Sequence, residues 1–351
     1  MSETLKNILI IKPSSLGDIV LVLPALTALR RSFPEAEISW LVRPEFAPLL
    51  ENHPHLTKTI PFDRKFLGKA WFNPYALGAL LSLIRLLHRS RYDAVFDFQG
   101  LFRTGSLAWL SGCKKRFGMA NAREFGCIFY THKVRQNQDC IHLVDYYLKM
   151  VKAAGVSDTG VEFLLPQNSP AANSIRKLLE KQGGEPGNYA VFVPGSARKD
   201  KRWPIEQFAV LAAKISSEFN LSIIATGTTS EAELIEKFKS YAGVPVVNLA
   251  GKTSLSDLVE LLKSAKLVVC NDTGPGHIAA ALGVPLVMIF GNVNPARLAP
   301  YKRPDCVVAV EPWNRPFQIR SSDLKYDIKN ISVDDVYTKV CEQIKLGSAE
   351  R

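Results

Sequence analysis

Hydrophobic residues follow two alternating patterns along the chain. Short β-branched runs predict strands, and stretches with apolar residues three or four apart predict amphipathic helices. Alternation of the two is typical of a parallel sheet covered by helices. The predicted strands are Ile8–Ile11, Ile38–Val42, Ala94–Phe98, Ala190–Val193, Ser222–Ala225, Val246–Asn248, Leu267–Cys270 and Leu286–Phe290. The predicted helices are Ile19–Ser32, Leu77–Arg89, Ile205–Phe219, Glu231–Ala242, Leu255–Ser264 and Val333–Ile344, the last with Ser332 as its N-cap.

The alternation restarts after residue 188, so the chain is predicted to hold two α/β domains. Its 351 residues agree with two domains of about 150 residues each. The segments Leu165–Pro170 and Gln182–Asn188 are polar and rich in proline or glycine, as domain boundaries commonly are. We place the hinge near residue 168. This predicts an N-terminal domain at 1–167, a C-terminal domain at 168–315 and a tail with the last helix at 316–351.

No segment has the length and composition of a membrane span. The longest apolar runs, Ile19–Leu29 and Leu77–Leu87, are shorter than the roughly 20 residues required, and Arg85 interrupts the second. The first strand follows the N-terminus closely, with no secretory cleavage site. A soluble cytoplasmic protein is expected.

Cysteine and histidine spacing carries no metal signature. His53 and His55 lie two apart with no third ligand at suitable spacing, and we expect both at the surface. No Asp-x-Asp pair occurs, so the usual cue for a metal bridging a nucleotide-sugar diphosphate is missing. The six cysteines are expected to be reduced thiols, at positions 113, 127, 140, 270, 306 and 341.

Positive charge is concentrated in the N-terminal half. The formal net charge is +11, and residues 58–135 hold 14 Lys/Arg against 4 Asp/Glu, an excess of +10. Such a field attracts nucleic acid, an anionic membrane or a small acidic substrate alike, and a solvated basic face is the plain alternative. Trp71, Phe72 and Phe102 lie among the cations, as base stacking on nucleic acid would require.

Loops that follow predicted strands carry the candidate chemistry. Lys12–Asp18 leads from the first strand into a helix, where Gly17 permits close approach and Asp18 supplies a carboxylate. Asp18 is equally suited to cap that helix. Asn271–His277 opens a predicted helix at Ile278–Leu282 and presents backbone N–H groups suited to a diphosphate.

The same glycines allow a rival interpretation. Gly274-x-Gly276-x-x-Ala279 has the spacing of a dinucleotide-binding fingerprint, but residues 290–300 lack the acid that would hold the ribose. A third loop, Val193–Pro204, carries several cations that suit a departing diphosphate or form a solvated surface. Glu231 either reaches a ribose diol or stabilises a helix N-terminus.

Taken in order, these motifs resemble glycosyltransferase family 9, the bacterial lipopolysaccharide heptosyltransferases. The resemblance rests on K-P-S-S-L-G-D-I-V-L-V-L-P-A-L at 12–26, D-K-R-W-P at 200–204 and N-D-T-G-P-G-H at 271–277. The stretch Tyr92–Leu101 and the turn Ala122–Glu124 are most similar to heptosyltransferase I. Ser196-Ala197 and Pro275-Gly276 depart from that pattern.

The resemblance implies a GT-B fold, in which two Rossmann-like domains face each other across a cleft and the last helix crosses back. The N-terminal domain would take Kdo-lipid A and the C-terminal domain ADP-heptose, with inverting transfer and no dedicated metal or further cofactor. Asp18 would be the general base. The implied donor-binding residues are Ser196, Lys201, Glu231, Asp272, Thr273, Gly274 and His277. The implied acceptor-binding residues are Ser15, Gly17, Arg64, Lys65, Lys69, Gln99, Arg103 and Arg123.

A lipid acceptor further implies peripheral association with the cytoplasmic face of the inner membrane, and no nucleic acid partner. Two alternatives keep the fold. One is heptosyltransferase II or III activity, or transfer from another nucleotide sugar. The other is a non-catalytic module that binds membrane or nucleic acid through its basic face; such a module would have no need of Asp18, Lys201 and His277.

Overall fold

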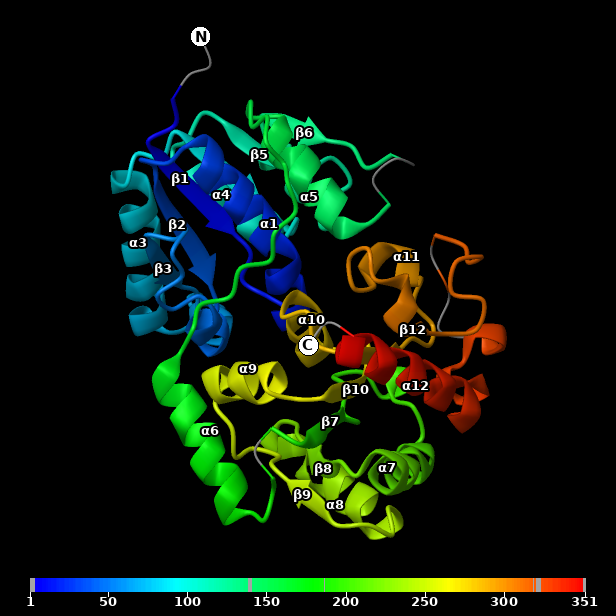
Figure 1. Cartoon of the computed structure of the whole chain (residues 1–351). Coiled ribbons are helices and arrows are strands. Elements are labelled where there is room, and N and C mark those ends of the chain that lie inside the picture. Colours follow the sequence, from blue (N-terminus) through cyan, green and yellow to red (C-terminus); the bar gives the residue numbers. More distant parts are fainter. Residues whose placement is uncertain (1–3, 138–140, 186, 318, 320–322, 350–351) are drawn as a thin grey trace. The chain divides into compact units, whose positions relative to one another are not determined.

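The computed structural model describes residues 4–137, 141–185, 187–317, 319 and 323–349. The chain forms two compact units, Met1–Pro166 and Gln167–Arg351 (Figure 1). Each unit contains one six-stranded sheet in which all paired strands are parallel. The predicted α/β class with two parallel sheets is therefore confirmed.

The sheet of the first unit has the order β3-β2-β1-β4-β5-β6. Its strands are β1 (Asn7–Ile11), β2 (Glu37–Val42), β3 (Lys58–Pro61), β4 (Ala94–Asp97), β5 (Arg116–Met119) and β6 (His132–Val134). Its helices are α1 (Leu16–Ser32), α2 (Arg64–Leu67), α3 (Pro74–Arg89), α4 (Phe102–Leu110) and α5 (Leu143–Lys152), with 3₁₀ turns η1 (Pro44–Leu49) and η2 (Gly126–Phe129).

Side chains of β1 alternate between the two faces of this sheet, because successive residues of a strand point to opposite sides. Leu9 and Ile11 join a buried cluster with Leu83 of α3 and Leu107 of α4. The other face is covered by α1, which packs against α5. Both faces of the central strands are buried, which explains why β1 is an uninterrupted apolar run.

The sheet of the second unit has the order β12-β11-β10-β7-β8-β9. Its strands are β7 (Tyr189–Val193), β8 (Ser222–Ala225), β9 (Val246–Asn248), β10 (Leu267–Asn271), β11 (Leu286–Ile289) and β12 (Val307–Val308). Its helices are α6 (Ser169–Lys181), α7 (Ile205–Phe219), α8 (Ala232–Tyr241), α9 (Leu255–Lys263), α10 (Gly274–Ala281), α11 (Pro295–Leu298) and α12 (Val333–Ala349). Its 3₁₀ turns include η4 (Lys199–Lys201) and η5 (Thr229–Glu231).

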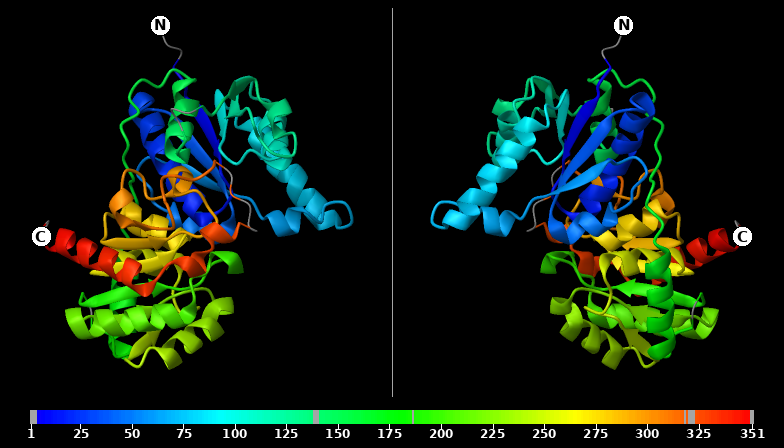
Figure 2. Two further views of the ribbon diagram at one scale, coloured as in Figure 1. Left: turned by 90° about the vertical axis from the view of Figure 1, so that its right-hand side faces the viewer. Right: turned by 90° about the vertical axis from the view of Figure 1, so that its left-hand side faces the viewer.

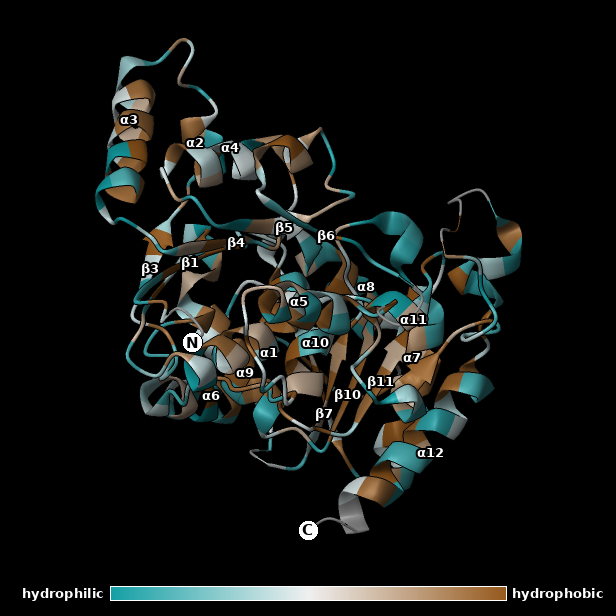
Figure 3. Cartoon of the chain, turned by 90° about the horizontal axis from the view of Figure 1, so that it is seen from above, coloured by the Kyte–Doolittle hydropathy of each residue, from teal (hydrophilic) through white to brown (hydrophobic). Residues whose placement is uncertain are grey.

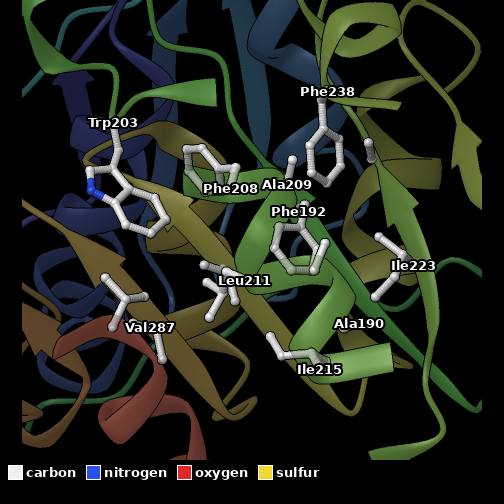
Figure 4. Packing of buried hydrophobic residues seen from close by; sticks show 14 of the residues in the cluster. Ala190, Phe192, Trp203, Phe208, Ala209, Leu211, Ile215, Ile223, Phe238 and Val287 are labelled. Atoms are coloured by element: carbon white, nitrogen blue, oxygen red, sulfur yellow. The ribbon is translucent and has the colours of Figure 1, made fainter. Parts of the chain in front are cut away.

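Aromatic side chains fill the core between this sheet and the helices α7 and α8 (Figure 4). Phe192 of β7 packs edge-on against Phe208 and stacks on Phe238. Val336 and Val340 of α12 belong to the same buried cluster. The segment expected as a tail therefore packs within the second unit through its last helix, while the crossing of that helix to the first domain stays a prediction.

Strands that the sequence pattern missed are short, and several carry polar residues. β3, β5 and β6 each include a lysine, arginine or histidine, and β12 has only 2 residues. Edge strands with one solvated side lack the continuous apolar signal of β1 or β7. The helix predicted at Ile278–Leu282 begins earlier, at Gly274, because Thr273 is its N-cap.

The expectation for His53 is wrong. Its side chain is buried, and its Nε2 lies 3.0 Å from the carbonyl oxygen of Leu164, which ties the end of the first unit to the loop after η1. Burial lowers the pKa of His53 to about 4, so the ring is neutral near pH 7. His55 is half-buried, with its Nδ1 lying 3.2 Å from the hydroxyl of Thr27.

Five of the six cysteines are free thiols: Cys113, Cys127, Cys270, Cys306 and Cys341. Cys140 lies outside the described residues. Among the helices within the described ranges, none combines the length and apolar character needed to cross a bilayer.

Gly118 of β5 provides a test of the packing in the first unit. A Cβ at this position would lie 2.3 Å from the ring of Tyr130, so we expect Gly118→Ala to lower the free energy of unfolding by about 1–3 kcal/mol. Gly78→Ala is the matched control, because a Cβ there meets open space within helix α3. Urea unfolding followed by circular dichroism measures both. An unchanged midpoint for Gly118→Ala would contradict this packing.

Candidate active site

Most candidate residues of each unit follow the two central strands of its sheet. Consecutive connections diverge there, between β1 and β4 in the first unit and between β7 and β10 in the second. Ligands of open α/β sheets bind at the carboxyl ends of strands at such switch points. Within each unit, the loops that follow these two strands therefore lie next to each other.

In the first unit, a buried lysine lies between these two loops. Lys12 is 4% exposed, and its Nζ donates a hydrogen bond to the carbonyl oxygen of Phe98 after β4 (3.3 Å). The same Nζ lies 3.7 Å from a carboxylate oxygen of Asp18. Lys12 was missed as a site residue from the sequence, where a cation directly at the end of an apolar strand was the available signal. Its ammonium group therefore places a positive charge beside the Asp18 carboxylate.

Asp18 acts as a helix cap. Ser15 donates to its Oδ2 from both the backbone N–H (3.1 Å) and the hydroxyl (2.9 Å), as in a capping box at the start of α1. The Asp18 side chain remains 29% exposed. Gly17 beside it is buried in the first turn. The carboxylate is therefore held in a fixed orientation while part of it stays accessible.

Gln99 joins the loop after β4 to the loop after β1. Its side-chain oxygen accepts from the N–H of Ser14 (3.3 Å), and its own N–H donates to the buried carboxylate of Asp97 (2.9 Å). That carboxylate also accepts from Gly100 (3.2 Å) and from the hydroxyl of Tyr130 (2.7 Å). Burial raises the pKa of Asp97, and these hydrogen bonds oppose the rise. Asp97, also missed from the sequence, shapes the loop that presents Gln99.

The basic residues assigned to the acceptor lie on the helices of the same unit. Arg64 and Lys65 are on α2, Lys69 follows it and Arg103 is in the first turn of α4; all four are exposed. Arg123 is exposed as well, and its backbone N–H donates to the carbonyl oxygen of Gly100 (2.9 Å). Arg123 is thereby positioned next to the Gln99 loop, whereas α2 is a separate cationic group.

In the second unit, Asn271 at the end of β10 fixes the opposite loop. Its side chain donates to the carbonyl oxygen of Pro194 (2.8 Å) and accepts from the N–H of Trp203 (3.0 Å). Trp203 is buried, and its ring N–H donates to Ile331 (2.9 Å). The loop after β7 is thus anchored at both ends, which positions the cationic turn η4.

This anchoring brings a lysine, an aspartate and a histidine side chain together at the start of α10. Lys201 Nζ lies 2.6 Å from one carboxylate oxygen of Asp272, and His277 Nε2 lies 3.7 Å from the other. The side chain of Asp272 is 7% exposed. Burial alone raises its pKa, but the neighbouring His277 ring and the Lys201 ammonium outweigh this and lower the pKa to about 2. Asp272 is therefore an anion at neutral pH.

Thr273 and Gly274 lie at the N-terminus of α10, as N-cap and first helical residue. The Thr273 hydroxyl donates to the carbonyl oxygen of Asn271 (3.2 Å). Packing explains why residue 276 is a glycine: a Cβ there would lie 2.3 Å from Met288 and 2.6 Å from the sulfur of Cys270. Close packing of α10 on the sheet, rather than ligand approach, requires this glycine.

The four cations after β7 differ in their partners. Arg198 forms an ion pair with Asp200, and Arg202 donates to the carbonyl oxygen of Ser196 through Nε (2.9 Å) and Nη2 (2.6 Å). Ser196 is buried by this arrangement, and Lys199 is exposed. Lys201 is the cation of this loop that reaches the end of β10.

Glu231 stabilises a helical turn, as one of its two predicted roles requires, and it also reaches a neighbouring loop. Its Oε2 accepts from the N–H (2.8 Å) and the hydroxyl (2.9 Å) of Thr228, so it stabilises the turn η5. The carboxylate also lies against Gly195, where a Cβ would be 2.1 Å from Oε1. Glu231 therefore reaches from the loop after β8 to the loop after β7.

No group of three or more His, Cys, Asp or Glu side chains is arranged to hold a metal ion within the ranges that the structure describes.

Comparisons with known proteins agree with this geometry. The model of glycosyltransferase family 9 (heptosyltransferase) matches residues 80–326. The lipopolysaccharide core heptosyltransferase OpsX of Haemophilus influenzae is 28% identical over 334 residues, covering 93% of this chain and 92% of OpsX. Lipopolysaccharide heptosyltransferase 1 of Escherichia coli is 29% identical over 301 residues, covering 84% and 91% of the two chains.

The solved structure of the E. coli heptosyltransferase WaaC with ADP-2-deoxy-2-fluoro heptose is also similar. It has a TM-score of 0.72 and 27% identity, covering 96% of this chain and 99% of WaaC. This likeness confirms the predicted GT-B class of fold.

The ion pair of Lys201 and Asp272 can be tested through stability. Lys201→Met leaves the buried carboxylate with less compensation, so we expect a loss of about 3 kcal/mol at pH 7. The pKa of Asp is about 3.9 in an unfolded chain and about 2 for Asp272 in the folded protein. Ionised Asp272 therefore stabilises the folded wild type at pH values above about 3.9, and this stabilisation is lost as the pH falls toward about 2. In the variant the pKa rises, so protonation removes the uncompensated charge.

The difference between the two proteins should therefore shrink below about pH 4. Urea unfolding at pH 7 and pH 3.5 measures it. Lys199→Met, on the same turn but exposed, serves as the control and should change little. An equal loss at both pH values would contradict a charge effect.

Proposed function

The chain belongs to glycosyltransferase family 9, the heptosyltransferases, and we propose that it adds a heptose to the inner core of lipopolysaccharide. The proposed donor is ADP-L-glycero-D-manno-heptose and the proposed acceptor is the Kdo of Kdo-lipid A. The names of OpsX and heptosyltransferase 1 support this reaction, as does the heptose analogue in the WaaC structure. The observation that carries the proposal is the buried cluster of Lys201, Asp272 and His277 at the start of α10.

On the donor side, this cluster suits a sugar bound through its diphosphate. The N-terminus of α10 presents partial positive charge, and Lys201 adds a full positive charge beside it. Asp272 holds Lys201 and His277 in place and offers a carboxylate for a sugar hydroxyl. Glu231, between two loops of the same unit, is assigned to the adenosine ribose. Charge that develops on the departing diphosphate is then stabilised by groups already in position.

On the acceptor side, Asp18 is the proposed general base. It removes the proton from an acceptor hydroxyl, the resulting oxygen attacks the anomeric carbon of the heptose, and the bond from that carbon to the ADP oxygen breaks. One displacement inverts the configuration and needs no enzyme nucleophile. Lys12, 3.7 Å from Asp18, places a positive charge beside the proposed base.

The exposed cations of the first unit are proposed to bind the acceptor. Kdo carries a carboxylate and lipid A carries phosphates, which match the group Arg64, Lys65, Lys69, Arg103 and Arg123. The Gln99 loop lies between the base and Arg123 in the hydrogen-bonded chain described above. We place the enzyme at the cytoplasmic face of the inner membrane, where a lipid acceptor is found.

Asp18→Asn separates the catalytic role from the capping role. Asparagine still accepts hydrogen bonds from Ser15 but cannot remove a proton, so we expect kcat to fall about 10²- to 10⁴-fold with stability lowered by no more than about 1 kcal/mol. ADP release and product mass, with and without Kdo-lipid A, measure transfer. Asp257→Asn changes the equivalent capping box with Ser254 on α9 and should retain activity. Full activity of Asp18→Asn would reduce Asp18 to a cap.

The basic group on α2 is expected to act on the acceptor alone. Replacing Arg64, Lys65 and Lys69 with alanine should raise the KM for Kdo-lipid A about tenfold to a hundredfold, because each cation near an anionic lipid contributes about 1 kcal/mol. The KM for ADP-heptose should not change. Lys237→Ala with Lys239→Ala, both exposed on α8, is the control. An unchanged acceptor KM, or activity only with a different acceptor, would redirect the assignment toward heptosyltransferase II or III.

A further inference from the structure

Exposed apolar side chains are concentrated on one part of the first unit. We call it the α2–α4 surface and define it by α2, α3, α4, η2 and the segments that join α2 to α3 and Arg123 to η2. Of the 18 large hydrophobic residues that are exposed within the described ranges, 11 belong to it. They are Phe66, Trp71, Phe72, Tyr75, Leu77, Leu81, Leu86, Phe102, Trp109, Phe125 and Ile128. Such a concentration is unusual for a surface in contact with water alone.

Three aromatic residues before and at the start of α3 are the most prominent. Trp71 is 96% exposed, Tyr75 82% and Phe72 77%. Asn73 caps the start of α3 by accepting from the N–H groups of Tyr75 (2.9 Å) and Ala76 (3.1 Å). The backbone that carries these aromatic rings is therefore held in a fixed turn. The three aromatic side chains are therefore exposed on an ordered part of the backbone.

Helix α3 continues the apolar character with cations beside it. Ala76, Leu83 and Leu87 face the core, whereas Leu77, Leu81 and Leu86 are exposed on the same helix. Figure 3 shows apolar and hydrophilic positions side by side along α3, and Figure 2 shows α3 extending outward from the first sheet. Helix α3 therefore has a core-facing side and a second, mixed side.

The charge of this region has one sign. Residues 64–92 contain Arg64, Lys65, Lys69, Arg85, Arg89 and Arg91 and not one Asp or Glu. Within this unit α2 contacts α3, α3 contacts α4, and α4 contacts η2, so the exposed side chains form a connected surface. Arg103 and Arg123 add positive charge on α4 and before η2.

We propose that the α2–α4 surface docks onto an anionic phospholipid bilayer, with Trp71, Phe72 and Tyr75 inserted among the lipid headgroups. Tryptophan and tyrosine favour the membrane–water interface, where an apolar ring and a polar atom are both satisfied. The surrounding arginines and lysines complement the negative lipid charge. This inference deepens the proposed function, on which it rests for the identity of the membrane, and it adds a defined hydrophobic anchor to attraction by charge.

Nucleic acid fits this surface less well. Binding of single strands uses aromatic platforms in a basic groove, but leucines do not stack on bases. Leu77, Leu81 and Leu86 instead extend the aromatic group with aliphatic side chains that lipid accommodates. Exposed aromatic and leucine side chains with arginine or lysine beside them are features of membrane-surface elements.

The test is sedimentation with vesicles in the absence of donor and acceptor. The full chain should bind vesicles of phosphatidylglycerol and phosphatidylethanolamine and bind phosphatidylcholine vesicles weakly. Trp71→Ser with Phe72→Ser should lower binding to the anionic vesicles at least about tenfold, because two large apolar side chains no longer leave water. Tyr241→Ser with Trp313→Ser is the matched control, since these aromatic residues are exposed to 55% and 52% on the second unit.

Insertion of Trp71 into the bilayer is tested by fluorescence. Nitroxide-labelled lipid should quench part of the tryptophan emission in the wild type, and Trp71→Phe should abolish most of that quenching. Equal binding by wild type and the Trp71/Phe72 double variant would overturn the proposal, as would tighter binding to an oligonucleotide than to anionic vesicles. A dimer that the double variant dissociates would assign the surface to a second copy of the chain instead.

Activity on a deacylated, water-soluble Kdo acceptor separates this inference from the proposed function. The double variant should transfer heptose to that acceptor as the wild type does, while transfer to Kdo-lipid A in vesicles falls. Equal loss on both acceptors would place Trp71 and Phe72 in the acceptor site and overturn the docking role. Vesicle binding without any heptosyl transfer would refute the proposed function and leave the surface assignment intact.

Discussion

A carboxylate that is almost fully buried requires compensating charges within a few ångströms, and Asp272 is such a group. Lys201 and His277 provide this compensation, but they come from different loops. Their approach depends on Asn271 and Trp203, which fasten the loop after β7 to the end of β10. The position of Lys201 beside Asp272 thus depends on the hydrogen bonds of Asn271 and on the buried indole of Trp203.

The first unit handles its carboxylates differently. Asp97 is buried, and its four oxygen contacts are uncharged N–H and O–H groups, so it shapes a loop. Asp18 is partly exposed and has a cation nearby, which suits a group that must exchange a proton. A capping box fixes its orientation without removing it from solvent. Helix capping and base catalysis are therefore compatible roles of one residue, since part of the capping carboxylate stays exposed.

The central strands and most long helices could be predicted from the sequence, because burial on both faces gives β1, β7 and β10 uninterrupted apolar runs. Edge strands such as β6, with its exposed His132 and Lys133, carry no such signal. Within the site, motif spacing identified Lys201 and Asp272 separately. Only the fold shows that they form an ion pair. Only the fold shows, too, that Arg202, three residues from Lys199 in the same basic run, donates a hydrogen bond to the carbonyl oxygen of Ser196.

The burial of Lys12 and His53 could not be predicted from the sequence. Both are polar residues, yet both are buried, and in each case a carbonyl oxygen, of Phe98 or Leu164, lies within hydrogen-bond distance of the side chain. Burying a polar group is costly unless a partner is present, and the partners lie 86 and 111 residues away in the chain. Trp71 shows the opposite case, an apolar side chain left in water. For Lys12 and His53, segments far away in the chain set the environment of the side chain, so the local sequence pattern cannot show it.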